Sequence, residues 1–162
     1  MRMDTCCFTG HRRLDPAILP ELRQAIAARI EQLIAQGVRY FVCGGALGFD
    51  TLAEETVLEA RARHTQVKLI LILPCRDQAV PWCASDRQRY DHLLAAADQI
   101  VYVQQTYTRG CMQRRNRHMV DSSGHCIYYL TRQGGGTAYT ADYAHRKGLR
   151  LYPLLNSQII DH

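Results

Sequence analysis

Two glycine-rich segments have the residue types and spacing of an anion-binding turn. They are Cys43-Gly44-Gly45-Ala46-Leu47-Gly48-Phe49-Asp50-Thr51 and Gly134-Gly135-Gly136-Thr137, and each lies between an apolar run and a helical pattern. A strand, a glycine turn and a helix start direct backbone N–H groups and the positive end of the helix toward an anion. Glycine also lets the backbone approach a ligand with no Cβ in the way. Two such turns in one small chain predict a shared cleft.

Basic residues supply the complementary charge. Gly10-His11-Arg12 follows the first apolar run, and Arg109 and Arg115 belong to a short segment rich in arginine. Arg115 is the expected phosphate clamp, because a guanidinium binds phosphate through two parallel hydrogen bonds. The alternative is that most of these arginines form a solvated helix face, and that His11 and Arg12 are simply a solvated pair.

Several candidates have a structural alternative. Gly44, Gly45 and Gly48 could merely satisfy a tight strand-to-helix turn, since a glycine pattern alone is weakly specific. Asp50 is either a helix N-cap or a partner for a ribose hydroxyl, because its charge would repel phosphate. Thr137 is either a helix cap or a hydroxyl donor to phosphate, and Asn116 contacts a sugar, a base or the backbone.

The predicted ligand-binding residues are therefore Gly10, His11, Arg12, Gly44, Gly45, Gly48, Asp50, Arg109, Arg115, Asn116, Gly134, Gly135, Gly136 and Thr137. Of these, Gly10, Gly44, Gly45, Gly135 and Thr137 are expected to line one cleft, with a bulky residue at Gly45 blocking the ligand and leaving the fold intact.

No convincing catalytic nucleophile or cofactor motif accompanies these residues. Cys75 follows a strand beside Arg76 and is interpreted as an inert thiol. The sequence lacks the Gly-x-x-x-x-Gly-Lys-Ser/Thr pattern of a P-loop, and it lacks a C-x-x-C pair, so a structural zinc site is not expected. The catalytic residues are therefore unknown, and a nucleotide-derived ligand is the one small molecule that these residues indicate.

The elements that must position these residues alternate between strand and helix. Strands are expected at 5–9, 38–43, 67–73, 99–103, 125–130 and 149–155. Helices are expected between them, with the apolar stripe Leu22, Ile26, Ile30, Leu33 and Ile34 in the first, and at about 50–64, 82–97, 112–121 and 137–147. Continuous apolar strands of this kind suit a parallel sheet covered on both faces. We predict one α/β domain over residues 1–162, a Rossmann-like, doubly wound sheet.

This arrangement predicts where the cleft lies. In doubly wound sheets, ligands bind at the carboxyl ends of the strands, where the strand order reverses. Gly10-His11-Arg12 and both glycine turns all follow strands, so they fall at that edge of the sheet.

Composition sets broad limits. The chain has 162 residues, a formal net charge of +5 and 47% apolar residues, which is ordinary for a globular protein. No apolar run approaches the roughly 20 residues of a membrane span, and Met1-Arg2-Met3-Asp4 does not resemble a signal peptide, so a cytoplasmic location is the expectation. Seven cysteines without repeating spacing argue against a disulfide framework.

Several motifs together resemble the YpsA-like family of the SLOG superfamily. They are Thr9-Gly10-His11-Arg12, the Cys43–Ala53 stretch, Leu73-Pro74-Cys75, Tyr107–Met112, Arg115–Val120 and Gly135–Tyr139, and the resemblance runs from about residue 5 to 155. Related proteins are the Lonely Guy phosphoribohydrolases and the Rossmann domain of the DNA-processing protein A family. The resemblance implies a Rossmann-like fold that binds a nucleotide or a nucleotide-derived ligand.

One departure bears on the reaction. In the phosphoribohydrolases a glutamate closely follows the second glycine motif, and the matching positions here are Tyr139 and Thr140. Glycosidic cleavage generally relies on a carboxylate near the sugar, so we expect poor phosphoribohydrolase activity.

Three functions follow, in order of preference. The first is binding of an ADP-ribose-like or NAD-like ligand by a sensor or regulatory protein. The second is hydrolysis of the N-glycosidic bond of a nucleoside 5′-monophosphate by a phosphoribohydrolase, and the third is binding of single-stranded nucleic acid. The expected partners are a small nucleotide-like ligand and a second copy of the chain in a homodimer, with nucleic acid less favoured and no membrane.

Overall fold

The computed structural model describes residues 2–160. The strands are β1 (Thr5–Gly10), β2 (Tyr40–Cys43), β3 (Lys68–Leu73), β4 (Gln99–Tyr102), β5 (His125–Tyr129) and β6 (Arg150–Pro153). The α-helices are α1 (Leu19–Ala35), α2 (Phe49–Arg63), α3 (Ala84–Ala96), α4 (Cys111–Asp121) and α5 (Gly135–Arg146), and the short 3₁₀ helices are η1 (Arg2–Asp4) and η2 (Pro16–Ile18). Met1, Asp161 and His162, which the predicted domain includes, lie outside the described residues.

The strands form one parallel sheet in the order β4-β3-β2-β1-β5-β6. The chain proceeds from β1 outward to β4, then crosses back to place β5 on the other side of β1. The strand order therefore reverses between β1 and β5. This single-domain, Rossmann-like fold confirms the predicted fold class, and the predicted strands begin within a few residues of the observed ones.

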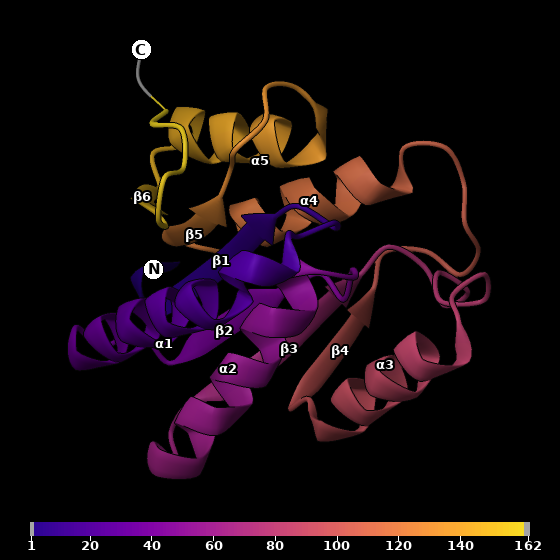
Figure 1. Ribbon diagram of the computed structural model, residues 1–162, viewed down its shortest axis with the longest axis horizontal. Helices are drawn as coiled ribbons and strands as arrows, with labels where there is room; N and C mark the ends of the chain where they lie inside the picture. Colours follow the sequence, from indigo (N-terminus) through magenta and orange to yellow (C-terminus); the bar gives the residue numbers. More distant parts are fainter. Residues whose placement is uncertain (1, 161–162) are drawn as a thin grey trace.

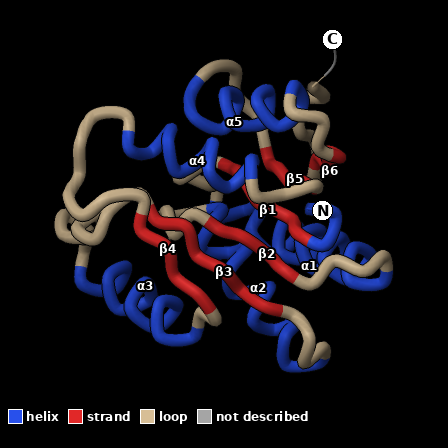
Figure 2. Tube along the Cα trace, turned by 180° about the vertical axis from the view of Figure 1, so that it is seen from behind, coloured by secondary structure: helices blue, strands red, loops and turns tan. Residues whose placement is uncertain are grey.

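Helices cover both faces of the sheet. Successive strand residues point to opposite sides, and because apolar residues lie on both sides, each face needs a cover. Cys6 and Phe8 of β1 belong to the core beneath α1, α2 and α3, whereas Cys7 belongs to the core beneath α4 and α5. Figure 1 shows α4 and α5 side by side, apart from α1 and α2, and Figure 2 gives the view from behind.

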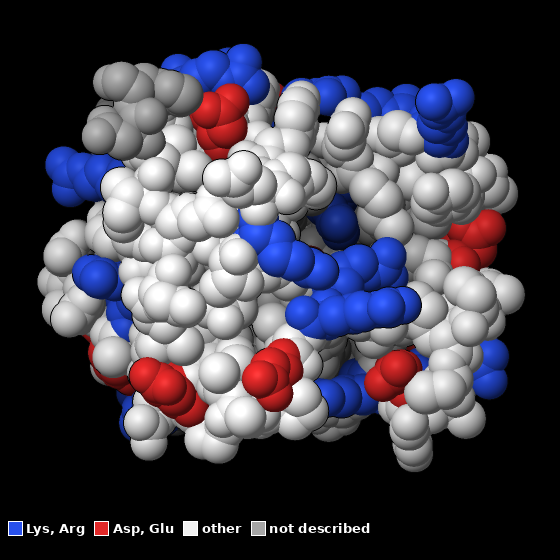
Figure 3. Space-filling model, turned by 45° about the horizontal axis from the view of Figure 1, so that its top comes forward, with Lys and Arg blue, Asp and Glu red and all other residues white. Residues whose placement is uncertain are grey.

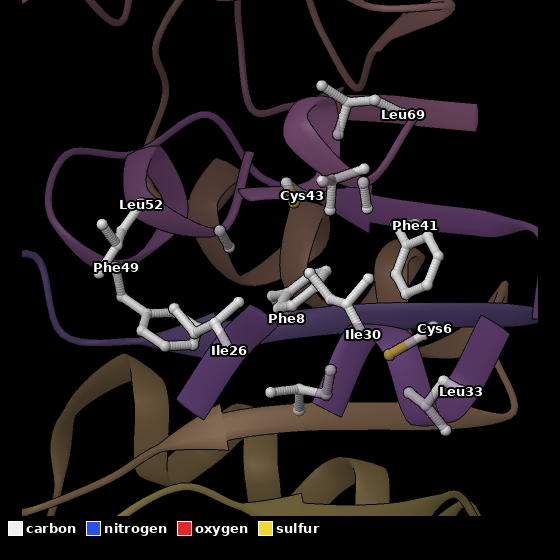
Figure 4. Packing of buried hydrophobic residues seen from close by; sticks show 14 of the residues in the cluster. Cys6, Phe8, Ile26, Ile30, Leu33, Phe41, Cys43, Phe49, Leu52 and Leu69 are labelled. Carbon is white, nitrogen blue, oxygen red and sulfur yellow. The ribbon is translucent and has the colours of Figure 1, made fainter. Parts of the chain in front are cut away.

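The apolar stripe predicted in the first helix forms the centre of the larger core. Leu22, Ile26, Ile30 and Leu33 are all fully buried. Figure 4 shows Ile26 and Ile30 pointing toward Phe8 of β1. Gly37 adopts a φ of 101° just after this helix, which is the C′ glycine that the sequence predicts.

Six of the seven cysteines are buried, and Cys83 is exposed. Cys6 and Cys43 are fully buried, and all seven cysteines are free thiols. Burial, with Asp77 close by, raises the pKa of Cys75 to about 11, so this thiol is protonated near neutral pH. Within residues 2–160, no helix combines the length and apolar character that crossing a membrane requires.

The end of β1 and the start of α2 approach so closely that two glycines are needed. A Cβ added to Gly10 would overlap the ring of Phe49, and one added to Gly48 would overlap the carbonyl oxygen of Arg12. The backbone N–H of Phe49 donates to the carbonyl oxygen of His11 at 3.1 Å. The loop after β1 is therefore packed directly against the first turn of α2.

Replacing Gly10 should destabilise the fold, because the added methyl group enters a packed core. We expect Gly10→Ala to lower the free energy of unfolding by about 1–3 kcal/mol, the usual cost of overpacking. The matched control is Gly136→Ala at the start of α5, where no atom lies within 4 Å of the added Cβ. Denaturant unfolding of both variants tests this, and equal stabilities would contradict the packing argument.

Candidate functional site

A cavity of about 510 Å³ opens where the strand order reverses, and we call it the switch-point cavity. Its walls are the segments that follow β1 and β5, the first turn of α2, and the facing sides of α4 and α5. Figure 3 shows a hollow in this face of the molecule, bordered by Lys and Arg side chains. The cavity lies at the position that the doubly wound topology predicts.

Most of the predicted ligand-binding residues meet in this cavity. Those that line it are Gly10, His11, Arg12, Asp50, Arg115, Asn116, Gly134, Gly135, Gly136 and Thr137. They come from four separate segments of the chain. Their contact with a ligand stays a prediction, but their convergence is a property of the fold.

Four of the predicted residues lie elsewhere. Gly44 and Gly45 are buried behind the cavity wall, and a Cβ at Gly45 would overlap the side chain of Leu73. Gly48 lines a different cavity, and Arg109 is exposed in the loop before α4. The expectation that Gly44 and Gly45 line the cleft is thus corrected. Gly45 has a φ of 70°, so a bulky residue there would strain the fold rather than only block a ligand.

Three arginines border the switch-point cavity with unpaired charges. Arg12 and Arg13 follow β1, Arg132 follows β5, and all three are exposed. Within residues 2–160, none of them forms a hydrogen bond or an ion pair through its side chain. Elsewhere on the described surface, five arginines are paired with carboxylates, namely Arg23, Arg61, Arg63, Arg89 and Arg146. The charges at the cavity mouth are therefore available to an anion.

The start of α5 presents a backbone surface without side chains. Gly134 precedes the helix, and Gly135 and Gly136 begin it. Gly136 has no positive φ, and a Cβ there would meet no atom within 4 Å. The protein's own packing thus does not require glycine at this position. An anion at this helix start would meet free backbone N–H groups and the positive end of the helix.

Arg115 forms the wall of the cavity from α4, and it is 5% exposed. Its Nη1 donates to the carbonyl oxygen of Gly44, and its Nε donates to Oδ1 of Asn116 at 2.7 Å. Its Nη2 contacts only the sulfur of Met112, at 3.8 Å, among the described residues. Burial lowers the pKa of Arg115, and the nearby Asp50 opposes this shift.

Two carboxyl groups of α2 lie near this guanidinium. Asp50 lines the cavity and accepts a hydrogen bond from the backbone N–H of Ala46 at 3.2 Å, and burial raises its pKa. Glu54, one turn further, is 1% exposed, and neither of its side-chain oxygens has a hydrogen-bond partner among the described residues. Burial, and secondly the charge of Asp50, raise the pKa of Glu54 well above its usual value. Burial thus favours the neutral form of Glu54.

His11 connects the segments that follow β1 and β5. Its Nε2 accepts a hydrogen bond from the backbone N–H of Thr131 at 2.9 Å, so Nδ1 carries the proton of the neutral ring. Burial, and secondly the charge of Arg132, lower the pKa of His11. A neutral imidazole thus fixes the start of the second glycine turn.

Sequence reasoning missed several residues of the cavity wall. They are Phe8, Thr9, Arg13, Ala46, Met112, Met119, Arg132 and Gln133. Arg132 could have been found by the rule that selected Arg12, because it too directly follows a strand. The two methionines carried no signal, since their helical spacing is that of ordinary core residues. Within residues 2–160, no group of three His, Cys, Asp or Glu residues is placed to hold a metal ion.

Comparison with known proteins identifies relatives. The family model YpsA, described as "YspA SLOG family", matches residues 6–154. An uncharacterized SPbeta prophage-derived protein, YoqJ, from Bacillus subtilis is 29% identical over 90% of this chain and 95% of its own length. A UPF0398 protein from Halalkalibacterium halodurans is 27% identical over 78% of this chain and 68% of its own.

Two solved structures share the fold. DNA processing protein A from Helicobacter pylori, described for its single-stranded DNA binding mode, superposes with a TM-score of 0.66 at 20% identity over 92% of this chain. The same protein from Streptococcus pneumoniae gives a TM-score of 0.68 at 16% identity over 97% of this chain. The matched regions cover 64% and 52% of those longer chains, and at this identity the likeness shows the fold alone.

The raised pKa of Glu54 gives the free energy of unfolding a distinct pH dependence. Below the ordinary glutamate pKa, the Glu54 carboxyl is protonated in both the folded and the unfolded chain. Above it the unfolded chain releases the proton first, so the free energy of unfolding falls as pH rises toward the folded-state pKa. Glu54→Gln removes this loss, and the stability of the variant relative to the wild type should increase from about pH 5 to about pH 8.

Glu55→Gln is the matched control with the opposite sign. Burial raises the pKa of Glu55, but hydrogen bonds from Arg89 and Arg23 outweigh this and lower it overall. Its carboxylate therefore stabilises the fold above the ordinary glutamate pKa, and that contribution is lost as pH falls. Urea unfolding across the pH range tests both variants. A flat difference between Glu54→Gln and the wild type would show that Glu54 is ionised in the folded state.

Proposed function

The chain belongs to the YpsA SLOG family, and from that premise we propose that the switch-point cavity binds a nucleotide or a nucleotide-derived ligand of the ADP-ribose or NAD type. One observation carries the proposal. The unpaired charges of Arg12, Arg13 and Arg132 border the same cavity as the side-chain-free start of α5. Unpaired cations and free backbone N–H groups at one site are the recognition chemistry of a phosphate group.

The phosphate is proposed to lie at the start of α5. Backbone N–H groups of Gly135 and Gly136 would meet its oxygens there, and the hydroxyl of Thr137 lies in the same turn. Arg132 and Arg12 would supply charge from the exposed side. Arg115 would contribute Nη2 from the wall, because its Nε already donates to Asn116 and its Nη1 to the carbonyl oxygen of Gly44.

The sugar and base are proposed to lie deeper in the cavity. Asp50 is the one acidic residue of the cavity lining among residues 2–160, and a carboxylate suits ribose hydroxyls better than phosphate. Asn116 presents an amide to the same space, and Met112 and Met119 supply apolar surface for a ring. A role as a sensor or regulatory protein follows from binding without an evident reaction.

Phosphoribohydrolase activity is the second candidate, and Asp50 is the observation that favours it. Burial raises the pKa of this carboxyl, and a carboxyl with a raised pKa can act as a general acid. The usual glycosidase mechanism needs two carboxyl groups on opposite sides of the bond, however, and Asp50 is alone in the lining of the cavity that the structure describes. Binding therefore ranks above hydrolysis.

Single-stranded nucleic acid is the third candidate. The fold likeness to DNA processing protein A, one example of which is described as binding single-stranded DNA, is what favours it. Such binding usually combines a basic groove with a series of aromatic side chains that stack on bases. The lining of the switch-point cavity has one aromatic residue, Phe8, and it is fully buried. A homodimer stays a prediction for all three candidate functions.

Removing the charge of Arg132 should weaken a nucleotide. A charge-assisted contact contributes roughly 1.5–3 kcal/mol, so Arg132→Gln should raise the Kd for adenosine 5′-monophosphate about tenfold or more. Arg109→Gln is the matched control, because Arg109 is an equally exposed arginine outside the cavity. Isothermal titration calorimetry measures both, and equal losses would indicate a general charge effect rather than a site.

Incubation with adenosine 5′-monophosphate should release little adenine. Turnover well below about one per second is expected, because typical enzymes reach at least that rate. Chromatographic detection of adenine tests this, with Asp50→Asn as the companion variant. Faster release that Asp50→Asn abolishes would replace the binding proposal with the hydrolase.

A further inference from the structure

A second cavity of about 700 Å³ lies on the other side of the α2 helix start, and we call it the tryptophan cavity. Its apolar lining includes Leu14, Leu47, Leu52, Trp82 and Tyr90. Trp82 and Tyr90 meet edge to face, with ring centroids 5.1 Å apart. Trp82 is half-buried, so part of its indole surface remains available to a ligand.

The two cavities share one boundary. Arg12 and Arg13 line both of them. The first turn of α2 and the loop before it form the partition, because Ala46 and Asp50 line the switch-point cavity while Leu47 and Thr51 line the tryptophan cavity. A ligand could therefore extend from one cavity to the other by passing beside the two arginines.

The charges of the tryptophan cavity are distributed unevenly. Arg23, Arg89 and the acidic Asp86 also line it, and both of these arginines form ion pairs with Glu55. The unpaired arginines are those at the boundary. An anionic group is therefore favoured at the boundary, and an uncharged ring is favoured against the leucines and the tryptophan.

We propose that the tryptophan cavity is a second nucleoside subsite, and that the preferred ligand consists of two nucleosides joined by a pyrophosphate. One nucleoside occupies the switch-point cavity, the pyrophosphate lies beside Arg12 and Arg13, and the second base packs against Trp82. Each cavity has the size of an ordinary small-molecule site, roughly 300–1,000 Å³. This proposal rests on the proposed function, since it extends the same ligand.

Three ligands separate the subsites by calorimetry, namely adenosine 5′-monophosphate, adenosine 5′-diphosphate and diadenosine 5′-pyrophosphate. The diadenosine compound should bind about tenfold or more tightly than the diphosphate, a gain that comes from the second nucleoside. Trp82→Ala should abolish this gain and leave the Kd for the monophosphate unchanged. Tyr107→Ala is the matched control, because Tyr107 is an exposed aromatic residue outside both cavities.

Trp82→Ala could also lose the gain because it disturbs the packing of the cavity, so a second variant with the opposite change is needed. Leu47 is half-buried in the loop before α2, so Leu47→Trp should fill the tryptophan cavity and again abolish only the gain. If the monophosphate binds and the diadenosine compound gains nothing, the second subsite is overturned while the proposed function stands. If none of the three ligands binds, the proposed function fails, and the subsite fails with it.

The last binding measurement uses a short oligodeoxyadenylate, a single strand of DNA. Binding of this strand that depends on Trp82, without any gain for the diadenosine compound, would assign the tryptophan cavity to single-stranded DNA and overturn the dinucleotide proposal. A gain for the diadenosine compound that both Trp82→Ala and Leu47→Trp abolish supports it.

Discussion

The buried guanidinium of Arg115 is the interaction on which the architecture of the site depends. It belongs to α4 on one face of the sheet, and it binds the carbonyl oxygen of Gly44 at the end of β2. Asp50 on α2 lies close enough to offset its charge. Removing one partner of a buried charge pair typically costs about 3–5 kcal/mol, because the other charge is left without compensation. The hydrogen bond to Gly44 thus ties α4 to the segment between β2 and α2, beside the cavity.

This arrangement divides the charges of the site by depth. In the wall, the charge of Asp50 opposes that of Arg115 and burial favours the neutral form of Glu54, so the wall itself adds little net charge. At the mouth, the side chains of Arg12 and Arg132 form no ion pair or hydrogen bond among the described residues, and Arg12 contributes only a secondary lowering of the pKa of Asp50. The positive potential of the cavity therefore comes mainly from its rim. A rim of this kind attracts an anion from solvent, while the wall is left to recognise its uncharged parts.

Much of this could be predicted from the sequence, because it depends on local patterns. The apolar strands and the stripe from Leu22 to Leu33 determine the layers, and the rule that ligands bind at strand ends selects Arg12 and the second glycine turn. The exclusion of Gly45 could not be predicted. It depends on the side chain of Leu73, which approaches across the sheet from β3. The engagement of Arg115 with Gly44 is likewise a contact between residues far apart in the sequence.

The glycines that carry the family resemblance therefore serve two different purposes. Gly10, Gly45 and Gly48 are required by the fold itself, since a Cβ at each would overlap neighbouring atoms. A match at these positions consequently indicates the Rossmann-like packing and says little about a ligand. Gly136 is different, because neither its φ nor its surroundings require glycine. Gly136 lies in the first turn of α5, so a glycine there agrees with the proposed approach of a phosphate to the backbone at the start of this helix.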